Sequence, residues 1–283
     1  MKPYIEFPHL GIKLFIDRVA FNIGAKPIYW YGIIIACGLV IAAMAAVRLG
    51  KRNGVSSDTI LDIVLFGIPS GIICARLYYV IFSFDDYRDN LLEIFKIWNG
   101  GIAIYGAVIG AVASTLVYCK VKKINPLPVM DDCSIGLVIG QMIGRWGNFF
   151  NQEAFGGNTN LPWGMTGSEI IEKLESMSAQ GLPVDPAIPV HPTFLYESLW
   201  NLAVLVVLLW VFYKKRKFDG QIFWSYIVFY GLGRVWIEGL RTDSLYLGTV
   251  RISQLVAAAC VLFGAAMLLR GFKLKRSETN DEV

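Results

Sequence analysis

The 283-residue sequence is poor in charged residues, which make up 17% of it against 55% hydrophobic residues. Its mean hydropathy of +0.52 lies well above that of a soluble domain of this size. Basic and acidic residues nearly balance, leaving a formal net charge of +4, and no basic stretch is interleaved with aromatic residues. These shortages argue against a soluble enzyme and exclude nucleic acid as an expected partner.

Cysteine and histidine are scarce as well. The five cysteines have no CxxC spacing and mostly lie within apolar runs, and there are only two histidines. This pattern indicates neither a disulfide framework nor a zinc site. The sequence also lacks HExxH, Walker and GxSxG motifs. We therefore expect chemistry that uses neither a metal nor another cofactor.

Long apolar runs, in contrast, are abundant. A bilayer core of about 30 Å is crossed by about 20 apolar residues in a helix. Seven stretches meet this requirement: 28–48, 60–82, 101–119, 129–150, 194–213, 221–240 and 252–270. The sequence predicts an all-α integral membrane protein with seven transmembrane helices, forming a single polytopic domain over residues 1–283.

The distribution of lysine and arginine predicts the orientation of these helices. Fourteen basic residues follow the odd-numbered helices closely, whereas nine are spread over the other side. Because basic residues collect on the cytoplasmic side, we expect the amino terminus outside and the carboxyl terminus inside. The first 27 residues lack the pattern of a cleaved signal peptide, so we expect nothing to be removed.

One connection is long, the segment 151–193 between the fourth and fifth helices. In the predicted topology it forms a small outward-facing cap, with a short amphipathic helix at 168–178 followed by a proline-rich stretch. The tail from Lys273 to Val283 is charged and is expected to be disordered.

Three arginines fall inside predicted spans, namely Arg76, Arg145 and Arg234. Each lies four to seven residues before the outer end of its helix, hence about 6–10 Å deep at 1.5 Å per residue. A charge at this depth is kept where it faces protein, water or a ligand. The alternative is three separate arginines whose long side chains reach the headgroups.

Further polar residues lie at the same depth. Arg145, Asn148 and Gln152 share one face of the fourth helix, and Tyr230, Arg234 and Glu238 form a stripe on the sixth. Arg234 and Glu238 form either part of a site or only a structural pair within the helix. Arginine forks suit phosphate, and at this depth the phosphate belongs to a phospholipid headgroup. A lipid transferase, a lipid flippase and an anion transporter all satisfy these observations.

The run GRWGNFFNQEAFG at 144–156 resembles the signature GRxGNFxNxExxG of bacterial prolipoprotein diacylglyceryl transferases. Other segments similar to this family occur in the same order along helices one to six: YWYG at 29–32, GG at 100–101 with YG at 105–106, HPT at 191–193 with LYE at 195–197, and YG at 230–231 with Arg234 and Glu238.

The resemblance implies a reaction and a location. The family transfers the diacylglyceryl group of phosphatidylglycerol to the thiol of the lipobox cysteine in a prolipoprotein signal peptide. A thioether forms and glycerol phosphate leaves. The implied partners are therefore phosphatidylglycerol, prolipoprotein signal peptides and membrane lipid. The implied location is the bacterial cytoplasmic or inner membrane, with the active site toward the outer leaflet.

The resemblance also implies roles for individual residues. Those expected to take part in catalysis are Arg145, Arg234, Tyr105, Glu153 and Glu238. Those expected to bind substrate are Tyr31, Arg76, Asn148, Asn151, Gly156, His191 and Tyr230. The two arginines of the catalytic set would hold the phosphodiester and stabilise charge on the departing phosphate, and Asn148 would orient the headgroup.

Tyr105 departs from the family pattern, because many members carry histidine there as a proposed base. The phenol of a tyrosine ionises only at about pH 10, so we expect Tyr105 to position a substrate group through its hydroxyl. Glu153, Glu238 or solvent would then take the thiol proton. The runner-up function is a lipid or anion transporter with the same arginine-lined cavity. The almost wholly apolar inner halves of the helices favour chemistry at one surface.

Overall fold

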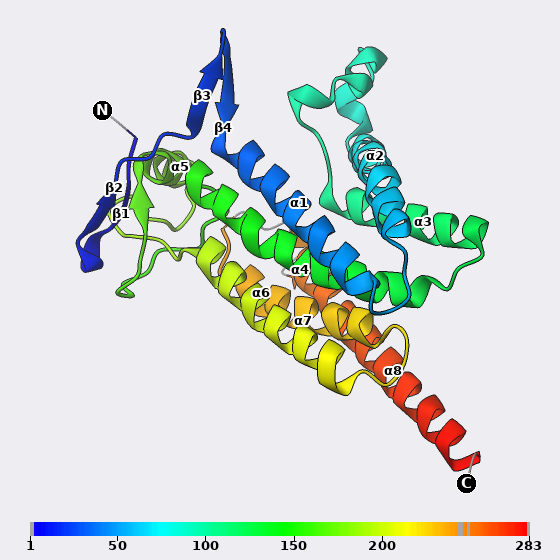
Figure 1. Cartoon of the computed structure of the whole chain (residues 1–283). Helices are drawn as coiled ribbons and strands as arrows, with labels where there is room; N and C mark the ends of the chain where they lie inside the picture. Colours follow the sequence, from blue (N-terminus) through cyan, green and yellow to red (C-terminus); the bar gives the residue numbers. More distant parts are fainter. Residues whose placement is uncertain (1–2, 243–245, 248–249, 282–283) are drawn as a thin grey trace. The chain divides into compact units, whose positions relative to one another are not determined.

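A computed structural model describes residues 3–242, 246–247 and 250–281 of the chain (Figure 1). The chain divides into two compact units, and each is described by itself. Unit 1 comprises residues 1–44 and 134–283, and unit 2 comprises residues 45–133. Helices α1 and α4 each run through a boundary between the units.

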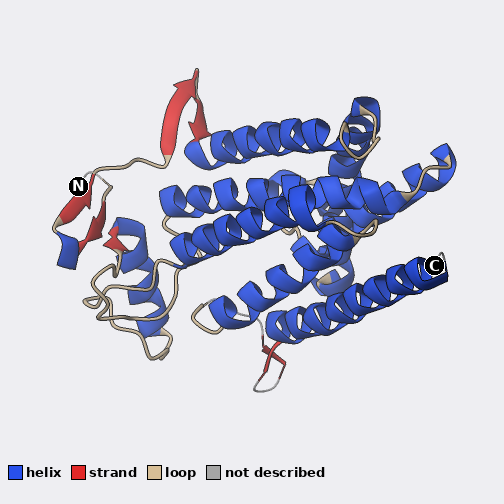
Figure 2. Ribbon diagram, turned by 60° about the horizontal axis from the view of Figure 1, so that its bottom comes forward, coloured by secondary structure: helices blue, strands red, loops and turns tan. Residues whose placement is uncertain are grey.

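Helices dominate the described residues, and the strands are short pieces beside them (Figure 2). The α-helices are α1 (Trp30–Gly50), α2 (Ser57–Phe82), α3 (Ile104–Lys122), α4 (Pro126–Asn151), α5 (Ser168–Ala179), α6 (Thr193–Trp210), α7 (Gln221–Glu238) and α8 (Ile252–Asp281). The strands are β1 (Ile5–Phe7), β2 (Ile12–Leu14), β3 (Val19–Ile23), β4 (Lys26–Tyr29), β5 (Thr166–Gly167), β6 (Tyr246–Leu247) and β7 (Val250–Arg251). The prediction of an all-α chain is therefore wrong in this respect, and the fold is mostly helical.

Each of the seven predicted membrane segments contains a helix. Within the described residues, six helices are long and apolar enough to cross a membrane: α1, α2, α3, α4, α6 with its continuation to Lys215, and α8. Helix α7 is not among them, and its sequence carries Arg234 and Glu238 within 18 residues. The structure thus supports a multi-pass membrane protein with six candidate spans within the described residues, and the seventh span, at α7, stays a prediction.

Unit 2 is built around the pair α2 and α3. Helix α2 begins at a Ser56 cap, whose hydroxyl accepts a hydrogen bond from the Thr59 amide at 3.1 Å. Gly106 of α3 lies against Cys74 and Ala75 of α2, at a place where any Cβ atom would overlap the Cys74 carbonyl. The missing side chain is what lets the two backbones approach so closely.

In unit 1, long-range strand pairing ties the cap segment 151–193 to the first residues of the chain. Strand β1 pairs antiparallel with β2 and with β5, so that Ile5 lies opposite Gly167 at the start of α5. Eight buried side chains form the core beneath this sheet: Ile5, Phe149, Phe155, Met165, Ile170, Leu174, Val190 and Phe194. This core fixes α5 and the ends of α4 and α6 to one another.

The two expectations for the cap and the tail have different outcomes. The short helix predicted at 168–178 is confirmed as α5. The tail prediction is wrong, because α8 continues as a helix to Asp281. At 30 residues, α8 is about 45 Å long, which exceeds the thickness of a bilayer core.

Candidate functional site

The candidate site in unit 1 forms where the ends of three helices meet. The last turns of α4 supply Arg145 and Asn148, the first turns of α6 supply Glu197, and the end of α7 supplies Arg234 and Glu238. Arg241 follows α7 directly. Helices α6 and α7 pack against each other, so the beginning of one and the end of the other face the same side of the unit.

A single carboxylate lies among three guanidinium groups at the centre of this site. The Glu197 carboxylate is 2.6 Å from Arg145, 3.4 Å from Arg234 and 3.6 Å from Arg241. Its side chain is only 10% exposed. These ion pairs bring together residues far apart in the sequence, so Arg145 and Arg234 are not separate side chains that only reach the headgroups.

Arg234 also pairs within its own helix. Its Nη2 atom lies 2.7 Å from the Glu238 carboxylate, and the Glu238 side chain is buried. Arg251 donates a hydrogen bond to the Glu238 backbone carbonyl. The site and the structural pair are therefore not exclusive alternatives, because Arg234 contacts Glu238 and Glu197 together.

A chain of amides links Arg145 to a second carboxylate. Arg145 donates to the Asn148 carbonyl oxygen at 3.2 Å, and the Asn148 amide donates to Glu153 at 2.9 Å. The Asn151 amide donates to the same Glu153 oxygen at 3.3 Å. Glu153 thus enters the site as an acceptor that two asparagines orient.

The turn that carries Glu153 has an unusual backbone. Gln152 and Ala154, on either side of it, have φ values of 48° and 55°, in the left-handed region that non-glycine residues rarely adopt. The Thr193 hydroxyl donates to the Ala154 carbonyl, and buried Gln152 accepts from the Glu169 amide at 3.1 Å. Such backbone strain persists only where the surroundings fix it, and it is concentrated at functional sites.

Gly156 and His191 are brought together by their backbones. The Gly156 amide donates to the His191 carbonyl at 2.9 Å, and a Cβ atom on Gly156 would lie 2.8 Å from the Leu240 carbonyl. The His191 ring lies 3.2 Å from the Tyr196 hydroxyl, and partial burial lowers the pKa of His191. Both residues therefore support the turn next to Glu153.

The two tyrosines predicted in this unit lie beside its arginines. The Tyr31 ring packs on Gly147, between Arg145 and Asn148 in α4. Tyr230 lies one turn before Arg234 in α7, with its ring 5.8 Å from that of Tyr226.

Arg76 and Tyr105 belong to unit 2. Arg76 is buried and donates to four backbone carbonyls, those of Glu93, Ile94, Gly100 and Gly101, at 2.6–2.8 Å. A guanidinium group with four protein acceptors is not a snorkelling side chain. We interpret Arg76 as the residue that folds the segment 83–101.

Two charged residues of the site were not predicted from the sequence, Glu197 and Arg241. Glu197 stands in the LYE segment near the start of a span, at the depth of the arginines, and this was a usable signal. Among the residues that the structure describes, no group of three or more His, Cys, Asp or Glu side chains is placed to hold a metal ion.

The arrangement suits a phosphate ester. Three guanidinium groups share the Glu197 carboxylate, and Arg234 also contacts Glu238. An arginine offers five N–H donors in a planar fork, and the Arg145 and Arg234 side chains retain 25% and 20% exposure. The site can therefore accept one further anion.

Comparison with known proteins points to the same chemistry. A family model described as prolipoprotein diacylglyceryl transferase matches residues 18–270. A phosphatidylglycerol–prolipoprotein diacylglyceryl transferase of Clostridioides difficile (strain 630) is 44% identical over 88% of this chain and 93% of its own. The enzyme of that name from Finegoldia magna is 44% identical over 90% of this chain and 96% of its own. The chain belongs to the prolipoprotein diacylglyceryl transferase family.

Proposed function

We propose that this protein transfers the diacylglyceryl group of phosphatidylglycerol to the lipobox cysteine thiol of a prolipoprotein. The bond between the diacylglyceryl carbon and the phosphate oxygen breaks, and that carbon forms a bond to the cysteine sulfur. Glycerol phosphate, which carries the other glycerol unit, leaves. The observation that carries this proposal is the Arg145–Glu197–Arg234 cluster, with distances of 2.6 and 3.4 Å. The names of the relatives at 41–44% identity support the same substrates.

Arg145 and Arg234 hold the phosphodiester in this mechanism. They donate to its non-bridging oxygens and stabilise the negative charge that grows on the phosphate as it departs. Glu197 keeps the two guanidinium groups apart and oriented before lipid binds. Asn148 and Asn151 orient Glu153, which accepts either a headgroup hydroxyl or the thiol proton.

Tyr105 and Glu238 complete the proposed catalytic set. The assignment of Tyr105 rests on the family resemblance, with its hydroxyl positioning the thiol or the phosphate. Glu238 fixes Arg234 at 2.7 Å and is the second candidate proton acceptor beside Glu153. The residues that shape the proposed binding site are Tyr31, Tyr230, Asn151, Gly156 and His191. Arg76 stays a predicted member of this set, and its donors bind the backbone carbonyls of the segment 93–101.

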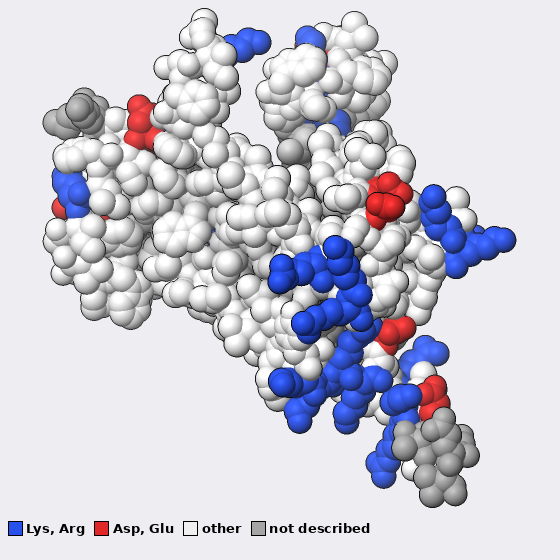
Figure 3. Space-filling model, in the orientation of Figure 1, with Lys and Arg blue, Asp and Glu red and all other residues white. Residues whose placement is uncertain are grey.

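The proposed membrane arrangement has seven spans, with α7 crossing among its neighbours. The amino terminus and the segment 151–193 face outward, the carboxyl terminus faces inward, and the site lies toward the outer leaflet of a bacterial cytoplasmic membrane. In unit 1, basic side chains gather over the connection from α6 to α7 and over the end of α8 (Figure 3). This distribution agrees with an inward orientation of those ends.

The transporter alternative requires a polar route to the inner face. Buried polar residues do occur near the inner end of unit 1, but they bond locally. Gln221 accepts from the Lys217 amide at 2.6 Å, and Ser225 donates to the Gln221 carbonyl at 2.7 Å. These bonds stay within the first turns of α7 and the residues just before it, which supports chemistry at the outer surface over transport.

Reconstitution tests the proposal directly. Purified protein is mixed with phosphatidylglycerol and a lipobox peptide, and mass spectrometry follows the diacylglyceryl mass on the cysteine. A peptide with Cys→Ser is the control, and vesicles that contain no phosphatidylglycerol are the second. Modification of the serine peptide, or none of the cysteine peptide, would contradict the proposal.

A further inference from the structure

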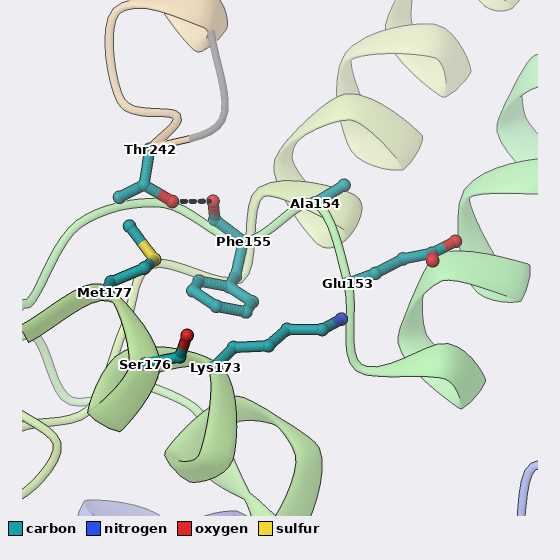
Figure 4. Close-up of a pocket in the computed structure, with 7 residues that line it drawn as sticks. All are labelled: Glu153, Ala154, Phe155, Lys173, Ser176, Met177 and Thr242. Carbon is teal, nitrogen blue, oxygen red and sulfur yellow. Dashed lines mark hydrogen bonds between the residues drawn. The ribbon is translucent and has the colours of Figure 1, made fainter. Parts of the chain in front are cut away.

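A cavity of about 330 Å³ lies in unit 1 beside the proposed site (Figure 4). One wall is the turn 153–155, and the opposite wall is α5 with Lys173, Ser176 and Met177. Thr242 closes a third side. In Figure 4 the Phe155 ring and the Lys173 side chain project between these walls. A volume of this size lies within the range of ligand pockets.

The walls are held in place before any ligand binds. Thr242 donates to the Phe155 carbonyl at 3.5 Å, and the Lys173 ammonium donates to the Gln152 carbonyl at 3.2 Å. Phe155 belongs to the buried core of the cap. The left-handed backbone at Ala154 is fixed by the Thr193 hydroxyl. The cavity is therefore part of the folded cap and not a gap between loose side chains.

The lining favours an uncharged ligand with carbonyl groups. Phe155 and Met177 supply an apolar surface, and Ser176 supplies a hydroxyl. An ammonium group has three N–H donors, and within the described residues Lys173 uses one of them, on Gln152. Glu153 also lines the cavity, so an anionic ligand would meet a negative charge beside the one positive charge of Lys173. A stretch of polypeptide fits this chemistry better than a phosphate.

Glu153 connects the cavity with the reaction site. Its backbone forms part of the cavity wall, while its carboxylate accepts from Asn148 at 2.9 Å, and Asn148 accepts from Arg145 at 3.2 Å. An extended peptide advances about 3.3 Å per residue. The residues that directly follow a cysteine held near Arg145 can therefore pass along Glu153 into the cavity.

We propose that this cavity binds the residues immediately after the modified cysteine of the polypeptide substrate. An uncharged side chain lies against Phe155 and Met177, and a backbone carbonyl of the peptide accepts a hydrogen bond from Lys173. This inference rests on the proposed transferase function and adds a determinant of peptide recognition to it. The lipid binds at the arginines, and the peptide extends outward over the cap.

Two peptides and three variants test the inference. The first peptide ends at its cysteine as an amide, and the second continues for three uncharged residues. The wild type should use the longer peptide with a kcat/KM about tenfold higher, the scale of one hydrogen bond to a charged group plus an apolar contact. Ser176→Trp fills the cavity and should remove this advantage while leaving the short peptide unaffected. Lys173→Met should remove part of it.

Ser178→Trp is the matched control, because Ser178 is exposed on the same helix and lies outside the cavity lining. It should behave as the wild type with both peptides. Equal use of the two peptides by the wild type would overturn the inference. The inference would also be overturned if Ser176→Trp raised the KM for phosphatidylglycerol and left the KM for the longer peptide unchanged. The cavity would then hold the lipid headgroup. Failure of the wild type to modify either peptide would contradict the proposed function itself.

Discussion

Glu197 places one negative charge among three arginines, and this explains how the site remains folded without lipid. Three guanidinium groups that share so small a volume repel one another unless a counterion lies between them. The carboxylate lies 2.6 Å from Arg145 and 3.6 Å from Arg241, so it supplies that counterion. When a phosphodiester binds, the arginines share two anions, and the lipid adds to an arrangement that already exists.

We expect Glu197→Gln to lower the thermal stability of the detergent-solubilised protein. The substitution keeps the shape of the side chain but leaves the arginines without their shared charge, and breaking a buried pair costs about 3–5 kcal/mol. Inorganic phosphate should raise the melting temperature of this variant more than that of the wild type. Glu175→Gln, at an exposed position on α5, is the control. Identical melting curves for the wild type and Glu197→Gln would show that Glu197 does not balance the arginines.

We expect Arg145→Ala to lower kcat by about a hundredfold to a thousandfold, because a donor aimed at developing charge contributes about 3–4 kcal/mol. Arg145→Lys should recover little, since lysine lacks the bidentate fork. The measurement is the rate of peptide modification per mole of folded protein. Arg48→Ala, in the last turn of α1 and at an exposed position, is the control. Near-normal turnover of Arg145→Ala would remove the residue from the mechanism.

We expect Tyr105→Phe to lower kcat by about tenfold to a hundredfold, the scale of one lost hydrogen bond to a charged group. Tyr105→His should retain measurable activity, because histidine can also donate. The pH–rate profile of the wild type should follow ionisation of the peptide thiol, at about pH 8.5 for a free cysteine. Complete loss of turnover in Tyr105→Phe, together with loss of an enzyme pKa from the profile, would instead identify the tyrosine as the base.

Helical spacing predicted much of the site, because it acts over a few residues. Arg145 with Asn148, and Arg234 with Glu238, are three or four residues apart, and both pairs are in contact. The Glu197 cluster joins three helix ends, and no local period reports such a contact. Depth alone did not predict the backbone carbonyls that the Arg76 guanidinium group binds, because they belong to a segment 17 to 25 residues further along the chain.

Among the secondary-structure elements, α3 offers the clearest test of close packing. We expect Gly106→Val to lower both the yield and the melting temperature of the protein, because its Cβ would overlap the Cys74 carbonyl of α2. Ala113→Val, which introduces the same side chain on the exposed face of α3, is the control. Size-exclusion chromatography and thermal unfolding provide the measurements. A Gly106→Val variant as stable as Ala113→Val would mean that α2 and α3 do not need this contact.

The sequence predicted the positions of the long helices but not those of the strands. The apolar runs located α1 to α4, α6 and α8, because helices satisfy their backbone hydrogen bonds within one segment. Strand β1 pairs with β5, at Ile5 with Gly167, across more than half of the chain. A three-residue strand with so distant a partner leaves no periodic signal in the sequence. The charged end of α8 was also not predicted, because its composition is typical of a disordered tail.

At the scale of the whole molecule, the number of spans decides which side of the membrane each terminus faces. Helix α7 decides it, because six spans would place the two termini on one side and seven would place them on opposite sides. Its charged residues reduce its hydropathy, but Arg234 and Glu238 pair with each other and with the site. A polar stripe that faces protein is compatible with a span, and we therefore expect α7 to cross the membrane.

Cysteine labelling in intact cells tests this topology. In a background where the five native cysteines are replaced by serine, a membrane-impermeant maleimide should label Ser178→Cys on α5 without permeabilisation. It should label Lys215→Cys, at the end of the segment that continues α6, only after the membrane is opened. The reason is that basic residues cluster around Lys215 and are retained on the cytoplasmic side. Protection of Ser178→Cys together with free labelling of Lys215→Cys would show that the topology is inverted. The arginine cluster would then lie in the inner leaflet, where an exported polypeptide could not reach it.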